Sequence, residues 1–263
     1  MDKLSKSRIK SVKALGTSKG RRESDCFKVE GTKLVLDTIG HFDVVTVVAT
    51  AAWYDANRGR LHAGIELCQA TREDLERMTS LSTAPDVIAV YRIPLVQFDP
   101  SATRTNLVLA LDTIQDPGNL GTIVRIADWF GIRHIVCSRE TVDIYNPKTI
   151  QSTMGALSRV AVTYHDLADL LGQLRADGVD VCGTFLGGDD IFDESTPLPS
   201  TGVIVIGNEG NGISDKIADL VTRRLTIPSY PPGEPTGESL NAAVATAITV
   251  STFRQRELKW QRK

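Results

Sequence analysis

The sequence contains few of the residues that build metal centres or disulfide frameworks. Its 263 residues include only four cysteines and four histidines, all widely separated. The cysteines form no CxxC pair and the histidines form no cluster, so the sequence predicts neither a zinc site nor a disulfide framework. Scattered cysteines are typical of a reducing compartment. We therefore expect a cytoplasmic protein that needs no metal.

Long hydrophobic runs are also absent from the sequence. No segment approaches the roughly 18 apolar residues that span a membrane, and the charged first residues are not followed by the apolar core of a signal peptide. We therefore expect no membrane association. The composition, 41% apolar and 24% charged, is that of a globular chain long enough for one large domain or two small ones.

The whole-chain charge gives no sign of nucleic-acid binding, but its distribution does. With 30 basic and 32 acidic side chains, the net charge is −2, whereas nucleic-acid-binding proteins carry basic patches. Residues 1–22 carry +7, and the rest of the chain carries −9. In this basic arm Ile9, Val12 and Leu15 recur at three-residue spacing, which predicts a short amphipathic helix with Lys and Arg on its outer face. The alternative is a solvated, partly disordered tail.

Strand patterns alternate with helical patterns in the first part of the chain. The patterns predict strands at 27–29, 44–48 and 86–93, and helices at 32–39 and after Thr71, with Asp74 at the capping-box position. Residues 1–98 are therefore predicted to form a small α/β domain that includes the basic arm. Residues 99–105 are rich in turn formers and are predicted to be a linker.

Residues 106–263 are predicted to form a second α/β domain. Its predicted strands are residues 106–111, 134–137, 160–163, 181–184, 203–207 and 224–227, and its predicted helices are residues 119–130, 166–176, 214–220 and 239–257. Short apolar strands that alternate with helices indicate a mostly parallel sheet covered on both faces. Ligands bind such sheets at loops beyond the carboxyl ends of strands, so loops 112–119, 207–213 and 228–239 are candidate ligand loops.

The first candidate loop leads into a helix that carries an arginine off its apolar face. Asn119 is predicted to cap this helix, and the predicted buried stripe consists of Ile123, Ile126, Ala127 and Phe130. Arg125 lies roughly opposite the stripe, either as a solvated surface residue or as an anion-binding residue near a helix N-terminus. Trp129 also lies off the stripe, and it is either part of a partner surface such as a dimer interface or a half-buried packing residue.

The other two candidate loops are rich in glycine and proline. The segment GVIVIGNEGNGIS (202–214) matches neither GxGxxG nor GxxxxGK[ST], which counts against a nucleotide-dependent enzyme. Its glycines favour a ligand loop over a simple strand–helix turn. The segment IPSYPPGEPTGESLNAAVATAI (227–248) precedes a helix that Ser239 is predicted to cap and that has Asn241 in its first turn.

The order and content of these three segments resemble the signature motifs of the SpoU (TrmH-type) RNA ribose 2′-O-methyltransferases of the SPOUT superfamily. Asn119, Gly121 and Arg125 match the first motif, GNEGNGIS the second and IP…SLNAAVA the third. KVEGTKLV (28–35) and VYRIP (90–94) resemble the ribosomal-protein-like substrate-binding domain of many members. The stretch between Ile227 and Ser239 is longer and richer in Pro and Gly than the third-motif loop of the family.

The resemblance implies a fold, a cofactor and an assembly. The catalytic domain of the family is a parallel α/β sheet with a deep trefoil knot near its C-terminus, an exception to the rule against knots. It binds S-adenosylmethionine in that knot, needs no metal and works as a homodimer. Matched by position, the cofactor-binding residues would be Thr184, Leu186, Gly207, Asn208, Gly212, Ile227 and Leu240.

The resemblance also implies which polar side chains act when a ribose 2′-hydroxyl attacks the sulfonium methyl group. They are Asn119, Arg125, Glu209, Ser239 and Asn241. Because a guanidinium is effectively always charged, we expect Arg125 to orient the ribose or phosphate and to stabilise the incipient alkoxide as a cation, and not to accept the proton. We expect Glu209 to hold its loop or Arg125, and the other three side chains to position the reactants.

The expected substrate is RNA, and the ribosomal-protein-like front domain favours rRNA over tRNA. The basic residues of residues 1–22 are expected to contact phosphates, namely Lys6, Arg8, Lys10, Lys13, Lys19, Arg21 and Arg22. The alternatives are a tRNA 2′-O-methyltransferase and a non-catalytic RNA-binding module on the same fold. The intact set of polar motif residues counts against a non-catalytic module.

Overall fold

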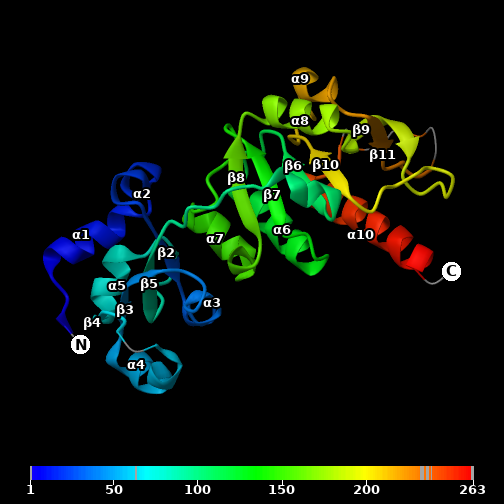
Figure 1. The fold of residues 1–263 in the computed structure, drawn as a ribbon. Helices are drawn as coiled ribbons and strands as arrows, with labels where there is room; N and C mark the ends of the chain where they lie inside the picture. The colour runs from blue at the N-terminus through cyan, green and yellow to red at the C-terminus, as the bar shows by residue number, and fades with distance from the viewer. Residues whose placement is uncertain (1, 63, 232–233, 235–236, 238, 262–263) are drawn as a thin grey trace. The chain divides into compact units, whose positions relative to one another are not determined.

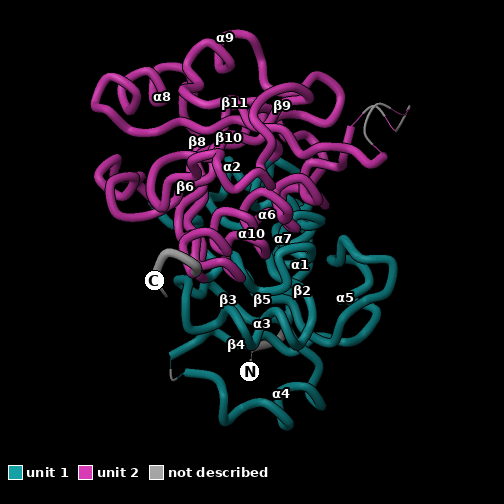
Figure 2. Tube along the Cα trace, turned by 90° about the vertical axis from the view of Figure 1, so that its right-hand side faces the viewer, with its two compact units in different colours: residues 1–95, 143–158 teal, residues 96–142, 159–263 magenta. Residues whose placement is uncertain are grey.

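The computed structural model describes residues 2–62, 64–231, 234, 237 and 239–261. Figure 2 colours its two compact units, of which unit 1 contains residues 1–95 and 143–158, and unit 2 contains residues 96–142 and 159–263. Residues 143–158, which the sequence places in the second domain, thus pack with unit 1. Among the helices of the described residues, none combines the length and the hydropathy of a membrane span.

Unit 1 is built on a five-stranded mixed sheet. The strands lie in the order β1 (Asp2–Lys3), β4 (Leu67–Gln69), β3 (Val44–Ala49), β5 (Val87–Arg92) and β2 (Cys26–Glu30). Strand β5 pairs antiparallel with both β2 and β3, whereas β4 pairs parallel with β1 and β3. The three strands predicted for this half of the chain are confirmed. The short strands β1 and β4 lack a pattern long enough to predict them.

Three helices of unit 1 lie on the stretches that the sequence patterns indicate, and three are additions. They are α1 (Lys6–Ala14), α2 (Ser18–Ser24), α3 (Thr32–Thr38), α4 (Ala51–Asn57), α5 (Arg72–Met78) and α7 (Pro147–Thr153), with short 3-10 turns η1 (Arg58–Arg60) and η3 (Ala156–Ser158). The capping box of α5 is confirmed, because Thr71 and Asp74 exchange hydrogen bonds. Helices α2, α4 and α7 were not predicted.

The basic arm is an integral part of unit 1 and not a disordered tail. Ile9, Val12 and Leu15 are buried with residues of β3, β5 and α5, which confirms the predicted amphipathic helix. Arg21 of α2 is only 3% exposed, and its guanidinium donates to Asp143 Oδ2 and to the carbonyl oxygen of Leu15. Arginine is seldom fully buried unless it is paired, so this arginine fastens α2 to the rest of the unit.

The segment 143–158 is joined to unit 1 by several contacts besides this ion pair. The ring of Tyr145 lies 4.6 Å, centroid to centroid, from the ring of Phe27 in β2. The side chain of Gln151 in α7 donates a hydrogen bond to the carbonyl oxygen of Glu30 (2.8 Å). Unit 1 is therefore completed by a segment that is distant in sequence, which no local pattern could indicate.

Unit 2 contains a six-stranded sheet in which every neighbouring pair is parallel. Its strand order is β11 (Arg223–Thr226), β9 (Val181–Asp190), β10 (Gly202–Ile206), β6 (Leu107–Leu111), β7 (His134–Ser138) and β8 (Ala161–His165). The pairing confirms the predicted parallel sheet. The central strands β6 and β10 are entirely buried, as expected for apolar strands covered on both faces.

Helices cover both faces of this sheet (Figure 1). One face carries α8 (Leu167–Ala176) and α9 (Asp215–Ala218), whose apolar side chains share a core with Val108 and Val203. The other face carries α6 (Pro117–Trp129) and α10 (Ala242–Gln261), which are held together by a hydrogen bond from Arg254 to the carbonyl oxygen of Phe130. The turn η2 (Pro100–Arg104) lies in the predicted linker. The trefoil knot stays a prediction.

Candidate active site

The site lies at the point where the strand order of unit 2 reverses. Strands β6 and β10 are neighbours in the sheet, but β7 and β8 continue on the side of β6, and β9 and β11 on the side of β10. The carboxyl ends of two such strands border a crevice that is the usual ligand site in open α/β sheets. Here a hydrogen bond from Asn208 Nδ2 to the carbonyl oxygen of Thr113 (2.8 Å) joins the two strand ends.

A buried carboxylate holds the C-terminal end of the glycine-rich loop 208–214. Asp112, 4% exposed, accepts hydrogen bonds from the backbone N–H (2.8 Å) and the hydroxyl (2.7 Å) of Ser214, and from the hydroxyl of Thr113 (3.0 Å). Thr113 has a φ of 59°, an unusual value for a β-branched residue. Asp112 and Thr113 together therefore hold both ends of the loop 208–214. Neither residue was predicted from the sequence, although both follow directly on a buried strand in a candidate loop.

The glycine-rich loop between these anchors is folded tightly upon itself. Asn208 and Gly212 exchange two backbone hydrogen bonds of 2.9 Å, and the side chain of Asn208 accepts from the backbone N–H groups of Gly210 and Asn211. A Cβ atom at Gly207 would lie 2.2 Å from the carbonyl carbon of Gly212. Only glycine fits at position 207, because the backbone of the returning loop fills the space of a side chain.

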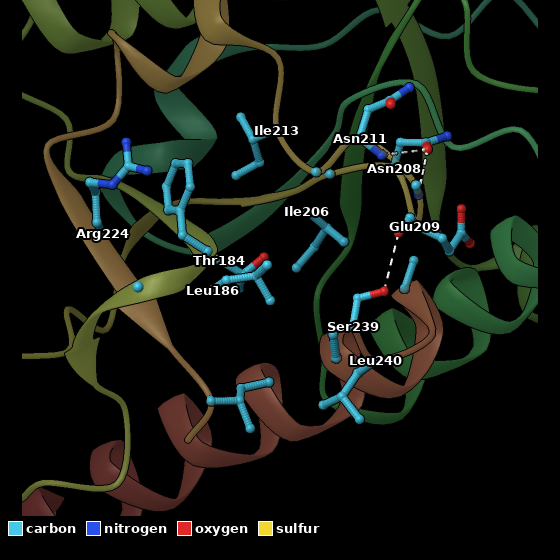
Figure 3. Close-up of a pocket in the computed structure, with 18 residues that line it drawn as sticks. Thr184, Leu186, Ile206, Asn208, Glu209, Asn211, Ile213, Arg224, Ser239 and Leu240 are labelled. Atoms are coloured by element: carbon cyan, nitrogen blue, oxygen red, sulfur yellow. Dashed lines mark hydrogen bonds between the residues drawn. The ribbon is translucent and has the colours of Figure 1, made fainter. Parts of the chain in front are cut away.

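This loop forms one wall of a pocket of about 750 Å³ (Figure 3). Other walls come from residues 184–187 of β9, from Ile227 after β11, and from four residues before and within the first turn of α10, namely Ser239, Leu240, Ala242 and Ala245. The structure brings all seven predicted cofactor residues to this pocket, namely Thr184, Leu186, Gly207, Asn208, Gly212, Ile227 and Leu240. Loop 228–239 contributes Ser239, whereas residues 232–233, 235–236 and 238 lie outside the described part of the chain.

Four of the five predicted catalytic residues form one hydrogen-bonded cluster at the edge of the pocket. Asn119 Nδ2 donates to Glu209 Oε1, and Asn241 Nδ2 donates to Asn119 Oδ1 (2.9 Å). The hydroxyl of Ser239 donates to the carbonyl oxygen of Glu209 (3.2 Å). Glu209 and Ser239 also line the pocket, so the cluster connects the pocket to the N-terminal turns of α6 and α10.

The two predicted helix caps are wrong, because each helix uses a neighbouring side chain. Helix α6 is capped by Asp116, whose carboxylate accepts from the backbone N–H of Asn119, and Pro117 is in its first turn. Asn119 thus lies in the first turn, and its side-chain amide is not used for capping. At α10, Asn241 accepts from the backbone N–H groups of the following turn, in place of Ser239. With these caps, the side chains of Asn119 and Asn241 are hydrogen-bonded to each other.

The fifth predicted catalytic residue, Arg125, lies about two turns along α6 and is exposed. Among the described residues its side chain has neither an ion pair nor a hydrogen bond, and it does not line the pocket. The apolar stripe of α6 is shifted from its prediction, because Leu120 and Val124 are buried while Ile126 and Phe130 are half-buried. Trp129 is 85% exposed, so it is not a half-buried packing residue of the chain, and its place in a partner surface stays a prediction.

The predicted RNA-binding residues of α1 and α2 differ in their availability. Lys6, Lys10, Lys13, Lys19 and Arg22 are exposed. Arg8 is half-buried and donates two hydrogen bonds to the carboxylate of Glu66. Arg21 is removed from the predicted set, because its buried guanidinium is already committed to Asp143. In the described residues, no group of three or more potential ligands could hold a metal ion.

Fold and site together define a class, namely a ligand-binding parallel α/β domain. Its pocket lies beside β9 and beyond the carboxyl end of β10, and amide and carboxylate groups of the three motifs border it. The model of the "SpoU rRNA Methylase family" matches residues 106–251, and the model of an "MRM3-like substrate binding domain" matches residues 6–89. The chain belongs to the SpoU rRNA methylase family.

Individual relatives are similar along nearly the whole chain. The 23S rRNA (guanosine(2553)-2′-O)-methyltransferase RlmP of Bacillus subtilis is 31% identical over 94% of this chain and 96% of its own length. A structure from Porphyromonas gingivalis, assigned to the TrmH family of RNA methyltransferases, is 37% identical with a TM-score of 0.85, covering 96% of this chain and 99% of that one. The AdoMet-bound rRNA methyltransferase from Sinorhizobium meliloti is 27% identical with a TM-score of 0.83, covering 97% of both chains.

Proposed function

We propose that this protein transfers the methyl group of S-adenosylmethionine to a ribose 2′-hydroxyl of rRNA. The observation that carries the proposal is the hydrogen-bonded chain from Asn241 through Asn119 to Glu209, which ends in the wall of the pocket. It places amide groups that can orient a hydroxyl beside a pocket that can hold a methyl donor. Family membership and the names of the relatives support the same reaction.

The pocket suits S-adenosylmethionine in size and in chemistry. A volume of about 750 Å³ lies within the range of about 300–1,000 Å³ that is usual for small-molecule sites. Ile206, Ile213, Ile227 and Leu240 offer an apolar surface for a purine. The folded loop 207–213 exposes backbone polar groups that can bind its edge. When bound, S-adenosylmethionine supplies a methyl group on a sulfonium centre.

The protein's own groups then have to align the ribose and stabilise the charge that develops on its oxygen. Glu209 and Asn241 hold the Asn119 amide in one orientation, and its second N–H group and second oxygen lone pair can bind the ribose. Arg125 is exposed and stays protonated in proteins, so we assign it to the phosphate or the incipient alkoxide as a cation. The proton leaves to water or to a neighbouring group.

Unit 1 would bind the RNA through the exposed cations of α1 and α2. These basic residues are Lys6, Lys10, Lys13, Lys19 and Arg22.

Two protomers would meet around Trp129. This side chain of α6 is 85% exposed, and a tryptophan so exposed is typical of interfaces. The substitution Trp129→Glu should therefore shift sedimentation from dimer towards monomer without changing the circular dichroism spectrum.

The test of the reaction is methylation of rRNA with labelled S-adenosylmethionine. The wild type should methylate ribosomal RNA from a strain that lacks the gene, and mapping should place the label on one 2′-oxygen. Asn119→Ala should reduce kcat at least about 100-fold, as expected for a lost transition-state contact, while S-adenosylhomocysteine still binds. Asn106→Ala is a control outside the cluster. If the rRNA of that strain lacked none of the 2′-O-methyl groups of the parent strain, the proposal would be contradicted.

The RNA-binding role of unit 1 is tested by charge substitution. Deletion of residues 1–22 is unsuitable, because it removes Ile9, Val12 and Leu15 from the core. Combined Lys6→Ala, Lys10→Ala and Lys13→Ala substitutions should instead reduce the slope of log K against log salt by about 0.7–0.9 for each lost phosphate contact. Lys216→Ala, an exposed cation of α9 in unit 2, is the control. An unchanged slope would exclude the α1 lysines from the RNA interface.

A further inference from the structure

One basic side chain lines the pocket and has no role in the three motifs. Arg224 of β11 is the sole cation among the described pocket-lining residues. Figure 3 shows it across the pocket from Glu209, the acidic residue that anchors the polar cluster. The two ends of the pocket therefore differ in charge, with a carboxylate beside the polar cluster and a guanidinium at the other end.

Arg224 is held in place by an aromatic platform. Its Cζ atom lies 3.5 Å from the centroid of the Phe185 ring, within the range of a cation–π contact. The ring in turn occupies the space next to Gly183, since a Cβ atom there would lie 2.8 Å from Phe185 Cε2. Gly183 is also the register partner of Arg224 in the β9–β11 pairing. Glycine, phenylalanine and arginine thus form one layered unit on the pocket wall.

This stacking leaves the hydrogen-bonding edge of the guanidinium unused. Stacking occupies a face of the planar group, whereas its five N–H donors point outward in the plane. Within the described part of the chain the guanidinium of Arg224 makes no hydrogen bond or ion pair. By contrast, Arg256 of α10 donates to four backbone carbonyl oxygens. An arginine in a ligand pocket whose guanidinium is held by stacking and whose N–H donors are free can bind a planar anion such as a carboxylate.

We propose that Arg224 binds the carboxylate of the methionine part of S-adenosylmethionine. The inference rests on the proposed function, because it uses the same cofactor. Its chemistry follows from matching the ligand to the walls of the pocket. The adenine fits the apolar residues, the reacting methyl group must lie near Asn119 and Glu209, and the one anionic group of the ligand remains for the one cation. Guanidinium and carboxylate match in a bidentate geometry.

The test combines one protein change with one ligand change. Wild type, Arg224→Gln and Arg224→Lys are titrated calorimetrically with S-adenosylhomocysteine and with its analogue that lacks the carboxylate. The wild type should bind S-adenosylhomocysteine at least about 10-fold more tightly than the analogue that lacks the carboxylate, a typical difference for a charge-assisted pair. Arg224→Gln should bind both ligands within about threefold of each other, and Arg224→Lys should fall between, because an ammonium lacks the planar fork.

Controls separate this contact from pocket shape and from the proposed function. Arg175→Gln, an exposed arginine of α8 away from the pocket, should keep the full ligand preference. Phe185→Leu should weaken the preference by removing the platform. Equal binding of both ligands by the wild type, or a preference that Arg224→Gln retains, overturns the assignment of Arg224. Failure of the wild type to bind either ligand would instead overturn the cofactor, and with it the proposed function.

Discussion

The substitution Asp112→Asn tests whether the buried carboxylate that ties down the glycine-rich loop controls cofactor binding. Asn keeps the shape of Asp but loses the charge that strengthens the two hydrogen bonds from Ser214 (2.8 and 2.7 Å). A hydrogen bond to a charged group contributes about 1.5–3 kcal/mol and a neutral one about 0.5–1.5 kcal/mol. For two bonds the loss is about 2–3 kcal/mol, and it falls on the loop that lines the pocket.

We expect two measurable results from this change. The dissociation constant for S-adenosylhomocysteine, measured by calorimetry, should rise about 10-fold, corresponding to about 1.4 kcal/mol of the loss. The remainder should appear as a decrease in the free energy of unfolding. Asp99→Asn is a matched control, since Asp99 accepts from the backbone N–H and the hydroxyl of Ser101 in the same way but is exposed and outside the pocket. Reduced stability with unchanged cofactor affinity would refute a positioning role for Asp112.

Three further substitutions follow from single contacts. Gly207→Ala should abolish measurable S-adenosylhomocysteine binding in a folded protein, because the added Cβ atom would lie 2.2 Å from backbone. Arg21→Met should lower the free energy of unfolding by about 2–4 kcal/mol in urea, since it leaves the carboxylate of Asp143 without its partner. Burial raises the pKa of Tyr91 to about 12, so its contribution to stability should be lost between pH 10 and 12. Tyr91→Phe should flatten the alkaline decrease of the melting temperature.

The sequence predicts the alternation of strands and helices well because the central strands carry uninterrupted apolar residues. The patterns at β6 and β10 indicate buried parallel strands without any tertiary information. Cap positions are harder, because several competent residues stand close together. Asp116 precedes Asn119, and Pro117 in the first turn marks the earlier start. The proline was a sufficient signal for this shift, whereas the start of α10 after Asn241 had no comparable marker.

Long-range partners could not be predicted from local patterns. Arg21 has the same appearance in the sequence as Arg22, and both belong to one basic run. Only the packing of residues 143–158 onto unit 1 brings Asp143 to one of them and leaves the other exposed. A charge pattern therefore predicts a candidate segment for nucleic-acid binding, but tertiary contacts decide which of its charges are available.

The position of Glu209 links the pocket to the groups that we propose for orienting the ribose. Its carboxylate accepts from Asn119 and its carbonyl oxygen from Ser239, while the residue itself lines the pocket. Asp112 and Thr113 fix both ends of the loop on which it lies. A ligand that contacts Glu209 in the pocket therefore also acts on Asn119, through the hydrogen bond between the two side chains. Cofactor bound first should therefore increase the affinity for RNA, and by linkage bound RNA should increase the affinity for cofactor by the same factor.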